Sequence, residues 1–218
     1  MSSFPGSPRI LKSGIVLIDA DTSAVTRVIA LQYNPDSLTR SLQVQAVSAD
    51  GVDRSEVLRL KGPPVETLKL DAEIDATDQL EFPEQNSGVI QSGIFAQLAA
   101  LETMVYPTSA QLRTNDAMSQ LGTLEIVPME TPLALFVWSK SRILPVRITE
   151  FSITEEAFDV SLNPIRAKVS LGLRVLSVND VPSGHKAASL FMSYLQQKEQ
   201  LAGGSKGQLS ALGITGVP

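Results

Sequence analysis

The chain has 218 residues, of which 43% are hydrophobic and 19% charged, a composition typical of a folded globular protein. It carries 18 Lys and Arg against 23 Asp and Glu, and this formal net charge of −5 disfavours nucleic acid as a partner. Cys is absent and His occurs once, which excludes disulfides, thiolate nucleophiles and Cys-based metal sites. The composition therefore favours a binding or scaffold protein without a cofactor over an enzyme.

The N-terminal segment MSSFPGSPR has no basic region followed by an apolar stretch, so it does not resemble a secretory signal. The most apolar cluster, residues 132–138, is far shorter than the roughly 20 residues of a membrane span. We expect a cytoplasmic protein that has no membrane partner.

Most of the chain has the two-residue period of β-strands. Residues 10–19, 25–33 and 38–47 are predicted as short strands, and residues 68–75 form the clearest one. In that strand the apolar side chains alternate with charged ones: Leu68, Leu70, Ala72 and Ile74 against Lys69, Asp71, Glu73 and Asp75. We expect it to be half-buried, with its apolar face in the core.

Residues 88–105 change to helical spacing. Apolar side chains recur at three and four residues, Ser87 is a suitable N-cap, and Pro107 ends the pattern. The pattern predicts one helix, inserted between strands and packed against them.

Strands return in the second half, at residues 123–127, 133–138, 144–153 and 165–175. In segment 144–153 the apolar side chains change from even to odd positions near Thr149 and Glu150. One extra residue there, a β-bulge, would keep them all on one face. The last strand carries Arg166, Lys168 and Arg174 on its polar face.

A second helix is predicted after Ser183, its N-cap, and is ended by Gly203 and Gly204. We expect this helix to lie outside the strand-rich region, and the Gly-rich tail after it to become ordered only on a partner. Both would form a docking arm, whose apolar residues are Leu190, Phe191, Tyr194, Leu195, Leu209, Leu212 and Ile214.

The predicted fold class is β-rich α+β, without the βαβ alternation of a doubly wound sheet. We expect a β domain over residues 1–180 that contains the inserted helix, and a C-terminal helix and tail over residues 181–218.

Four carboxylates gather near one strand, at Asp71, Glu73, Asp75 and Asp78. They could offer ligands for Ca²⁺ or a general acid and base. However, side chains two residues apart on a strand project in parallel, about 6 to 7 Å from one another, and do not converge on a cation. The alternative is a polar face opposed by Arg166, Lys168 or Arg174 of a neighbouring strand or subunit.

Three segments resemble, in order, the tube-type baseplate proteins of contractile injection systems. They are IALQYNPDSLTRSL (29–42), LRLKGPPVETLKLDAEIDATDQLE (58–81) and ILPVRITEFSITEEAFDVSLNPIRAKVSLGLRVL (143–176). The shared features are an Asn-Pro after an aromatic residue, a Gly-Pro-Pro corner before the acidic strand, and a hairpin before the last strand. Many relatives in that family carry a C-terminal LysM module, which is absent here.

The resemblance implies a two-sheet antiparallel β-barrel of the phage tail-tube type, assembled as a hexameric ring. It implies that the ring joins a spike hub protein to an inner tube protein and to surrounding baseplate wedge proteins. The polar strand faces would then be lumen or assembly surfaces, and neighbouring subunits would close the sheet edges. These faces are formed by Asp71, Glu73, Asp75, Arg166, Lys168 and Arg174.

A carbohydrate-binding or hydrolytic β-sandwich is the alternative. Hydrolysis would need two carboxylates about 5 to 10 Å apart across a cleft. Sugar binding favours exposed aromatic platforms, whereas only 5% of the residues are aromatic.

Overall fold

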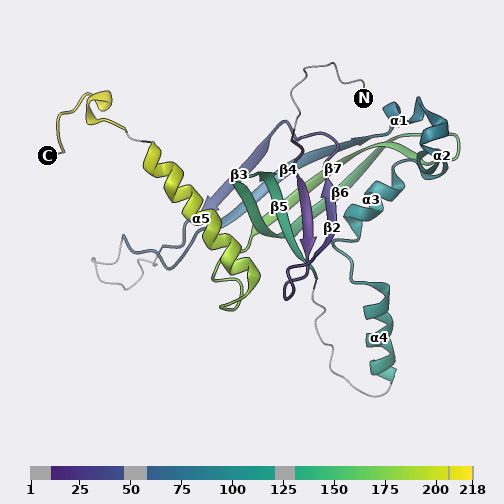
Figure 1. Cartoon of the computed structure of the whole chain (residues 1–218), viewed down its shortest axis with the longest axis horizontal. Coiled ribbons are helices and arrows are strands. Elements are labelled where there is room, and N and C mark those ends of the chain that lie inside the picture. The colour runs from purple at the N-terminus through teal and green to yellow at the C-terminus, as the bar shows by residue number, and fades with distance from the viewer. Residues whose placement is uncertain (1–10, 47–57, 121–130, 206, 218) are drawn as a thin grey trace.

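The computed structural model describes residues 11–46, 58–120, 131–205 and 207–217. Its centre is one antiparallel sheet of seven strands in the order β2-β1-β5-β6-β7-β4-β3 (Figure 1). The strands are β1 (Gly14–Ile18), β2 (Val25–Ala30), β3 (Leu38–Gln43), β4 (Val65–Asp75), β5 (Leu133–Ser139), β6 (Arg142–Phe158) and β7 (Pro164–Val175). The β-rich α+β class is confirmed, and the predicted strand at residues 123–127 lies outside the described residues.

The long strand β6 belongs to both halves of this sheet. Its first residues pair with β5, and from Val146 onward it pairs with β7. The pairing with β7 shifts between Ile148 and Glu150, so Thr149 is the extra residue of the predicted bulge. The bulge returns Phe151 and Ile153 to the core side, where both pack against the core together with Ile148.

The sheet is curled, because its two edge strands are joined by a short connection. A flat sheet of these seven strands would measure roughly 29 Å from β2 to β3. The seven residues between Ala30 and Leu38 reach at most about 28 Å when extended, and they bend instead. Side chains of β1 and β5 also share one buried cluster with those of β4 and β7, so the two halves turn toward each other.

Side chains of the Gln-Tyr-Asn-Pro segment hold this connection in place. Gln32 exchanges two hydrogen bonds with the backbone of Asp75, at 2.6 and 3.0 Å. Asn34 accepts from the backbone N–H of Ser13 at 2.8 Å and donates to the carbonyl of Leu11 at 2.8 Å. The segment thus links the end of β4 to the chain before β1.

The closed two-sheet barrel is not what the structure shows. Among the described residues, hydrogen bonds join all seven strands into one sheet, and none pairs β2 with β3. The physical reason is β6, which bends at its bulge without ending, so that both halves stay hydrogen-bonded to one strand.

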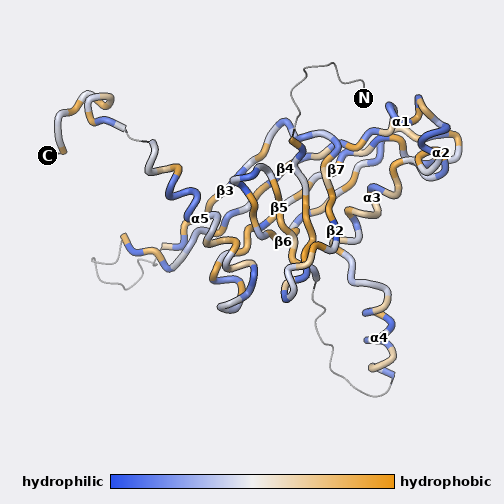
Figure 2. Tube along the Cα trace, in the orientation of Figure 1, coloured by the Kyte–Doolittle hydropathy of each residue, from blue (hydrophilic) through white to orange (hydrophobic). Residues whose placement is uncertain are grey.

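The core lies on the inner face of the curl. Leu68, Leu70 and Ile74 of β4 are buried as expected, and Val169, Leu171 and Leu173 of β7 are buried beside them. They join Ile15 of β1 and Phe136 of β5 in one cluster. Figure 2 shows hydrophobic residues concentrated on the strands in the middle of the molecule.

The single helix predicted at residues 88–105 is wrong, because the structure divides it into α2 (Ser87–Ser92) and α3 (Phe95–Glu102). The break is at Gly93, whose φ of +56° is left-handed, and a Cβ there would lie 2.0 Å from the carbonyl oxygen of Pro164. Only glycine permits the backbone to approach β7 this closely. Ile94, Leu98 and Leu101 are buried, so the packing on the sheet is confirmed.

Three further helical segments in this insertion were not predicted: α1 (Thr77–Leu80), a 3-10 turn (Pro83–Gln85) and α4 (Ser109–Gln120). The helix α4 extends away from the sheet in Figure 1 and has no buried residue. Its sequence has no apolar stripe, which is the reason that periodicity did not reveal it.

The C-terminal helix α5 (Lys186–Gly204) begins at His185 and not at Ser183, since the Nδ1 of His185 accepts the backbone N–H of Ala187 at 3.1 Å. A 3-10 turn (Leu209–Leu212) follows in the tail. No helix in the described part of the chain is long and apolar enough to cross a membrane.

Candidate assembly surfaces

The outer face of the curled sheet carries a ladder of opposite charges between β4 and β7. Asp75 lies opposite Arg166 in the strand register, and Glu73 lies opposite Lys168. Arg166 contacts Asp75 at 2.7 Å, and Lys168 contacts Asp71 diagonally at 3.3 Å. The expectation that basic residues of a neighbouring strand oppose the carboxylates is confirmed for these pairs.

Hydrogen bonds hold two of these carboxylates in the charged form. The hydroxyl of Ser170 donates to Asp71 at 2.6 Å, and with Lys168 it lowers the pKa of the Asp71 carboxyl. Hydrogen bonds from Thr77, followed by those from Arg166, lower the pKa of Asp75. The hydrogen bond to Asp75, followed by the charge of that carboxylate, in turn raises the pKa of Arg166. The lowered pKa values keep Asp71 and Asp75 ionised to a lower pH than ordinary aspartates.

The carboxylates do not assemble into a metal site within the part of the chain that the structure describes. No three His, Asp or Glu side chains there are placed to hold one ion. Neighbouring carboxylates on β4 project side by side and turn toward cations of β7.

Arg174 lies on the same face but does not belong to this ladder. It stands opposite Thr67 on β4 and opposite Arg147 on β6. Its guanidinium contacts Asp180 at 2.6 Å, beyond the end of β7. The expected surface therefore consists of one ladder of five residues and a separate Arg174–Asp180 pair.

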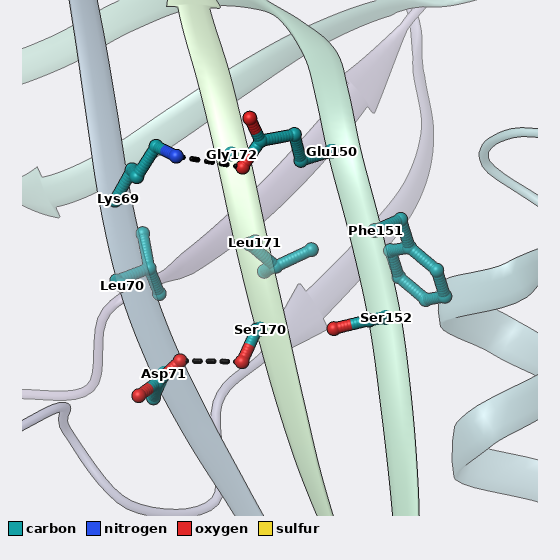
Figure 3. A pocket seen from close by; sticks show the side chains of 9 residues that line it. All are labelled: Lys69, Leu70, Asp71, Glu150, Phe151, Ser152, Ser170, Leu171 and Gly172. Carbon is teal, nitrogen blue, oxygen red and sulfur yellow. Dashed lines mark hydrogen bonds and ion pairs between the residues drawn. The ribbon is translucent and has the colours of Figure 1, made fainter.

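A shallow groove of about 560 Å³ crosses the middle of this face (Figure 3). Lys69 and Glu150 form an ion pair across it at 2.8 Å, and both side chains are largely exposed. Its floor includes Gly172, where a Cβ would lie 2.8 Å from that of Glu150. The bulged β6 therefore runs close to β7 here, and the groove is open, with charged side chains beside apolar ones.

A buried ion cluster on the inner face was missed at the level of sequence. Glu66 of β4 is 3% exposed, and its carboxylate accepts from Arg40 of β3 and from Lys198 of α5, both at 3.0 Å. The hydroxyl of Tyr194 donates to the same carboxylate at 3.3 Å. The alternation of side chains along β4 could have revealed the cluster. Glu66 precedes Leu68 by two residues, so it lies on the same, apolar face of the strand.

The first half of α5 packs on the chain's own sheet, which corrects the expected position of this helix. Phe191 and Tyr194 are buried in the main core, and Ala187 is buried in a smaller cluster on the other side of β5. Leu190 and Leu195 are half-buried beside them. These residues stabilise the β domain itself, because they share its two clusters of buried side chains.

The rest of the arm remains exposed. Leu209, Leu212 and Ile214 are exposed, as are all the other described residues after Gln200. Their role in docking, and a domain boundary at residue 180, remain predictions.

Both edges of the sheet are open within the described residues. No strand pairs with the outer side of β2 or of β3. Val25 and Val28 on β2, and Leu42 on β3, expose large apolar side chains. Open edges of this kind are sites at which another chain can add a strand.

No protein-family model and no curated protein matches this chain. Among solved structures, it is similar to a chain from the tail of an empty GTA particle with C6 symmetry, at 13% sequence identity and a TM-score of 0.28. That match covers 75% of this chain and 90% of the other.

Proposed function

We propose that this protein is a structural subunit of a contractile injection particle that assembles into a ring. The observation that carries the proposal is the outer face of the sheet, an ion-paired polar surface between two open edges. A subunit with this design can place a hydrated wall along a pore and contact neighbours at both edges.

The segment order in the sequence agrees with such a role. The Asn-Pro segment, the corner before β4 and the hairpin between β6 and β7 resemble those of tube-type baseplate proteins. In this structure the Asn-Pro segment joins the two edges of the sheet. The corner leads into β4 and the hairpin leads into β7, the two strands of the charged ladder. The proposed position is between the spike hub and the inner tube, as a hexameric adaptor that also contacts the wedges.

The adaptor is proposed to act through geometry and not through catalysis. A sugar-binding or hydrolytic sandwich is less favoured, because Asp75 and Asp71 are ion-paired with Arg166 and Lys168. The groove beside them is lined by a single aromatic side chain, Phe151.

Sedimentation of the purified full chain tests this proposal directly. We expect a concentration-dependent assembly with the mass of six copies, visible as rings by negative-stain electron microscopy. A protein that stays monomeric at all concentrations, and that does not copurify with tube and hub proteins, would contradict it. Turnover of a glycan substrate would support the sandwich instead.

A further inference from the structure

The turn between β6 and β7, residues 158–162, exposes apolar side chains at one end of the molecule. Val160 is 105% exposed and Leu162 is 80% exposed, and Phe158 next to them is 49% exposed. We call this turn the tip. No large hydrophobic side chain in the described residues is more exposed than Val160.

The tip is held rigidly from within. The carboxylate of Asp159 accepts the backbone N–H of Ser161 at 2.7 Å and that of Asn163 at 2.8 Å. It also accepts the side-chain amide of Asn163 at 2.8 Å. These hydrogen bonds hold the backbone that carries the apolar side chains, so less conformational entropy is lost when a partner binds them.

The backbone of the tip is strained. Leu162 has a φ of +64°, and Ala157, just before the tip, has a φ of +53°. Both lie in the left-handed region, in which glycine or asparagine is more favourable. A leucine that is both strained and exposed contributes little to the stability of its own chain. Such a residue indicates a contact with another molecule.

A second exposed apolar surface lies near the opposite end of the long axis in Figure 1. There β3 continues beyond Gln43 and bridges from Ala46 to Leu60. Leu42, Val44 and Leu60 are 47%, 64% and 65% exposed. We call residues 42–46 together with 60–61 the ribbon.

The two surfaces carry opposite charges. The tip is flanked by the exposed carboxylates of Glu155 and Glu156 in addition to Asp159. The ribbon carries Lys61, and beside it Arg40 and Lys198 share the single carboxylate of Glu66. Opposite charge around apolar centres favours contact between these two surfaces over contact of either with itself.

We propose that the tip of one copy packs on the ribbon of the next copy. This inference rests on the proposed ring and names the contact within it. Because the two surfaces are different, the contact is head-to-tail, the type that closes into a ring when the rotation between copies permits. The ribbon continues β3, so this contact would also cover one open edge of the sheet.

Two full-length variants test the contact. The tip variant carries Val160→Asp and Leu162→Asp, and the ribbon variant carries Val44→Asp and Leu60→Asp. Each is expected to weaken self-association by about 30-fold or more, the effect of removing an interface hot spot. The matched control is Leu112→Asp on the exposed helix α4, which should assemble like the wild type.

Mixing the two variants gives the decisive measurement. Each mixed pair retains one intact tip and one intact ribbon, so light scattering should detect pairs that neither variant forms alone. Variants that still assemble alone, or a mixture that stays monomeric, would overturn the proposal. A control that dissociates as strongly as the tip variant would overturn it as well.

A third variant, Leu162→Asn, separates strain from binding. Asparagine tolerates the left-handed backbone, so the melting temperature of the monomer should rise by about 2 to 4 °C. Self-association should weaken in the same protein, and unchanged association would contradict a role for Leu162.

The two proposals fail in different ways. If the wild-type chain does not self-associate, the ring itself is wrong. If it assembles and the tip and ribbon variants assemble equally well, only the tip-to-ribbon contact is wrong.

Discussion

Glu66 and Asp71 lie on the same strand and both bind cations, but they face opposite sides of the sheet. The side chain of Glu66 is 4% exposed, whereas that of Asp71 is 53% exposed. A buried carboxylate needs partners that replace its lost water, and Glu66 obtains them from β3 and α5. An exposed pair such as Asp71–Lys168 adds about 0 to 1 kcal/mol and leaves its charges available to other molecules.

The difference indicates that burial separates ion pairs that hold the chain together from pairs that contact its surroundings. We therefore expect changes on the inner face to lower the free energy of unfolding, and changes on the outer face to alter assembly.

The largest effect is expected from removing the arm. A chain that ends after Asp180 loses Phe191 and Tyr194 from the core, each a loss of about 3 to 5 kcal/mol, together with the partners of Glu66 on α5. Thermal unfolding should lose its cooperativity. A chain that ends after Gly204 is the control and should melt like the full chain. A cooperative wild-type transition in residues 1–180 would mean that the β domain is independent of α5.

A single truncation on the inner face of the sheet, in β4 or in β7, is expected to have the next largest effect. Leu70→Ala or Leu171→Ala should lower the free energy of unfolding by about 2 to 5 kcal/mol, measured by urea titration, because each residue is almost fully buried. Lys69→Ala on the outer face should change it by less than about 0.5 kcal/mol. Equal effects at positions 69 and 70 would contradict the assignment of the two faces.

Glu66→Gln tests the buried cluster itself. The amide keeps the shape but leaves two cations without a counter-charge, so we expect a loss of about 1 to 3 kcal/mol. Arg40 and Lys198 are about one-third exposed, which limits the loss. In hydrogen exchange, amides of α5 should lose protection before those of β5. Unchanged exchange in α5 would show that Glu66 does not hold the helix.

The smallest effect on folding is expected at the ladder. The pKa values of Asp71 and Asp75 are lower in the folded chain, so their contribution is present above pH 4 and is lost as the pH falls through the folded values. Replacing both with Asn should cost less than about 2 kcal/mol at pH 7, and the difference from the wild type should vanish in acid. The same variant should alter ring formation in sedimentation. Normal rings would contradict a lumen or assembly role of the ladder.

The strands and the bulge could be predicted because they depend on local alternation. The parity change at Thr149 and Glu150 locates the bulge, and the charged positions of β4 and β7 identify their outer faces. The packing of α5 could not be predicted, since an apolar stripe does not state which surface it covers. The break at Gly93 depends on Pro164, 71 residues later in the chain, and no local pattern contains that information.

The order of strands also affects how this chain folds during synthesis. Strand β4 pairs with β7, and the ion pair between them joins Asp75 to a residue 91 positions later. The ribosome needs about 5 to 18 s to synthesise these 91 residues. During this time β4 has no β7 to pair with, and the apolar side chains of Leu68 and Leu70 lack the partners they have in the folded core. Long-range pairing of this kind also folds slowly. We expect the nascent chain to depend on chaperones until β7 has emerged, and ribosome-bound chains arrested before Pro164 to be protease-sensitive throughout β3 and β4.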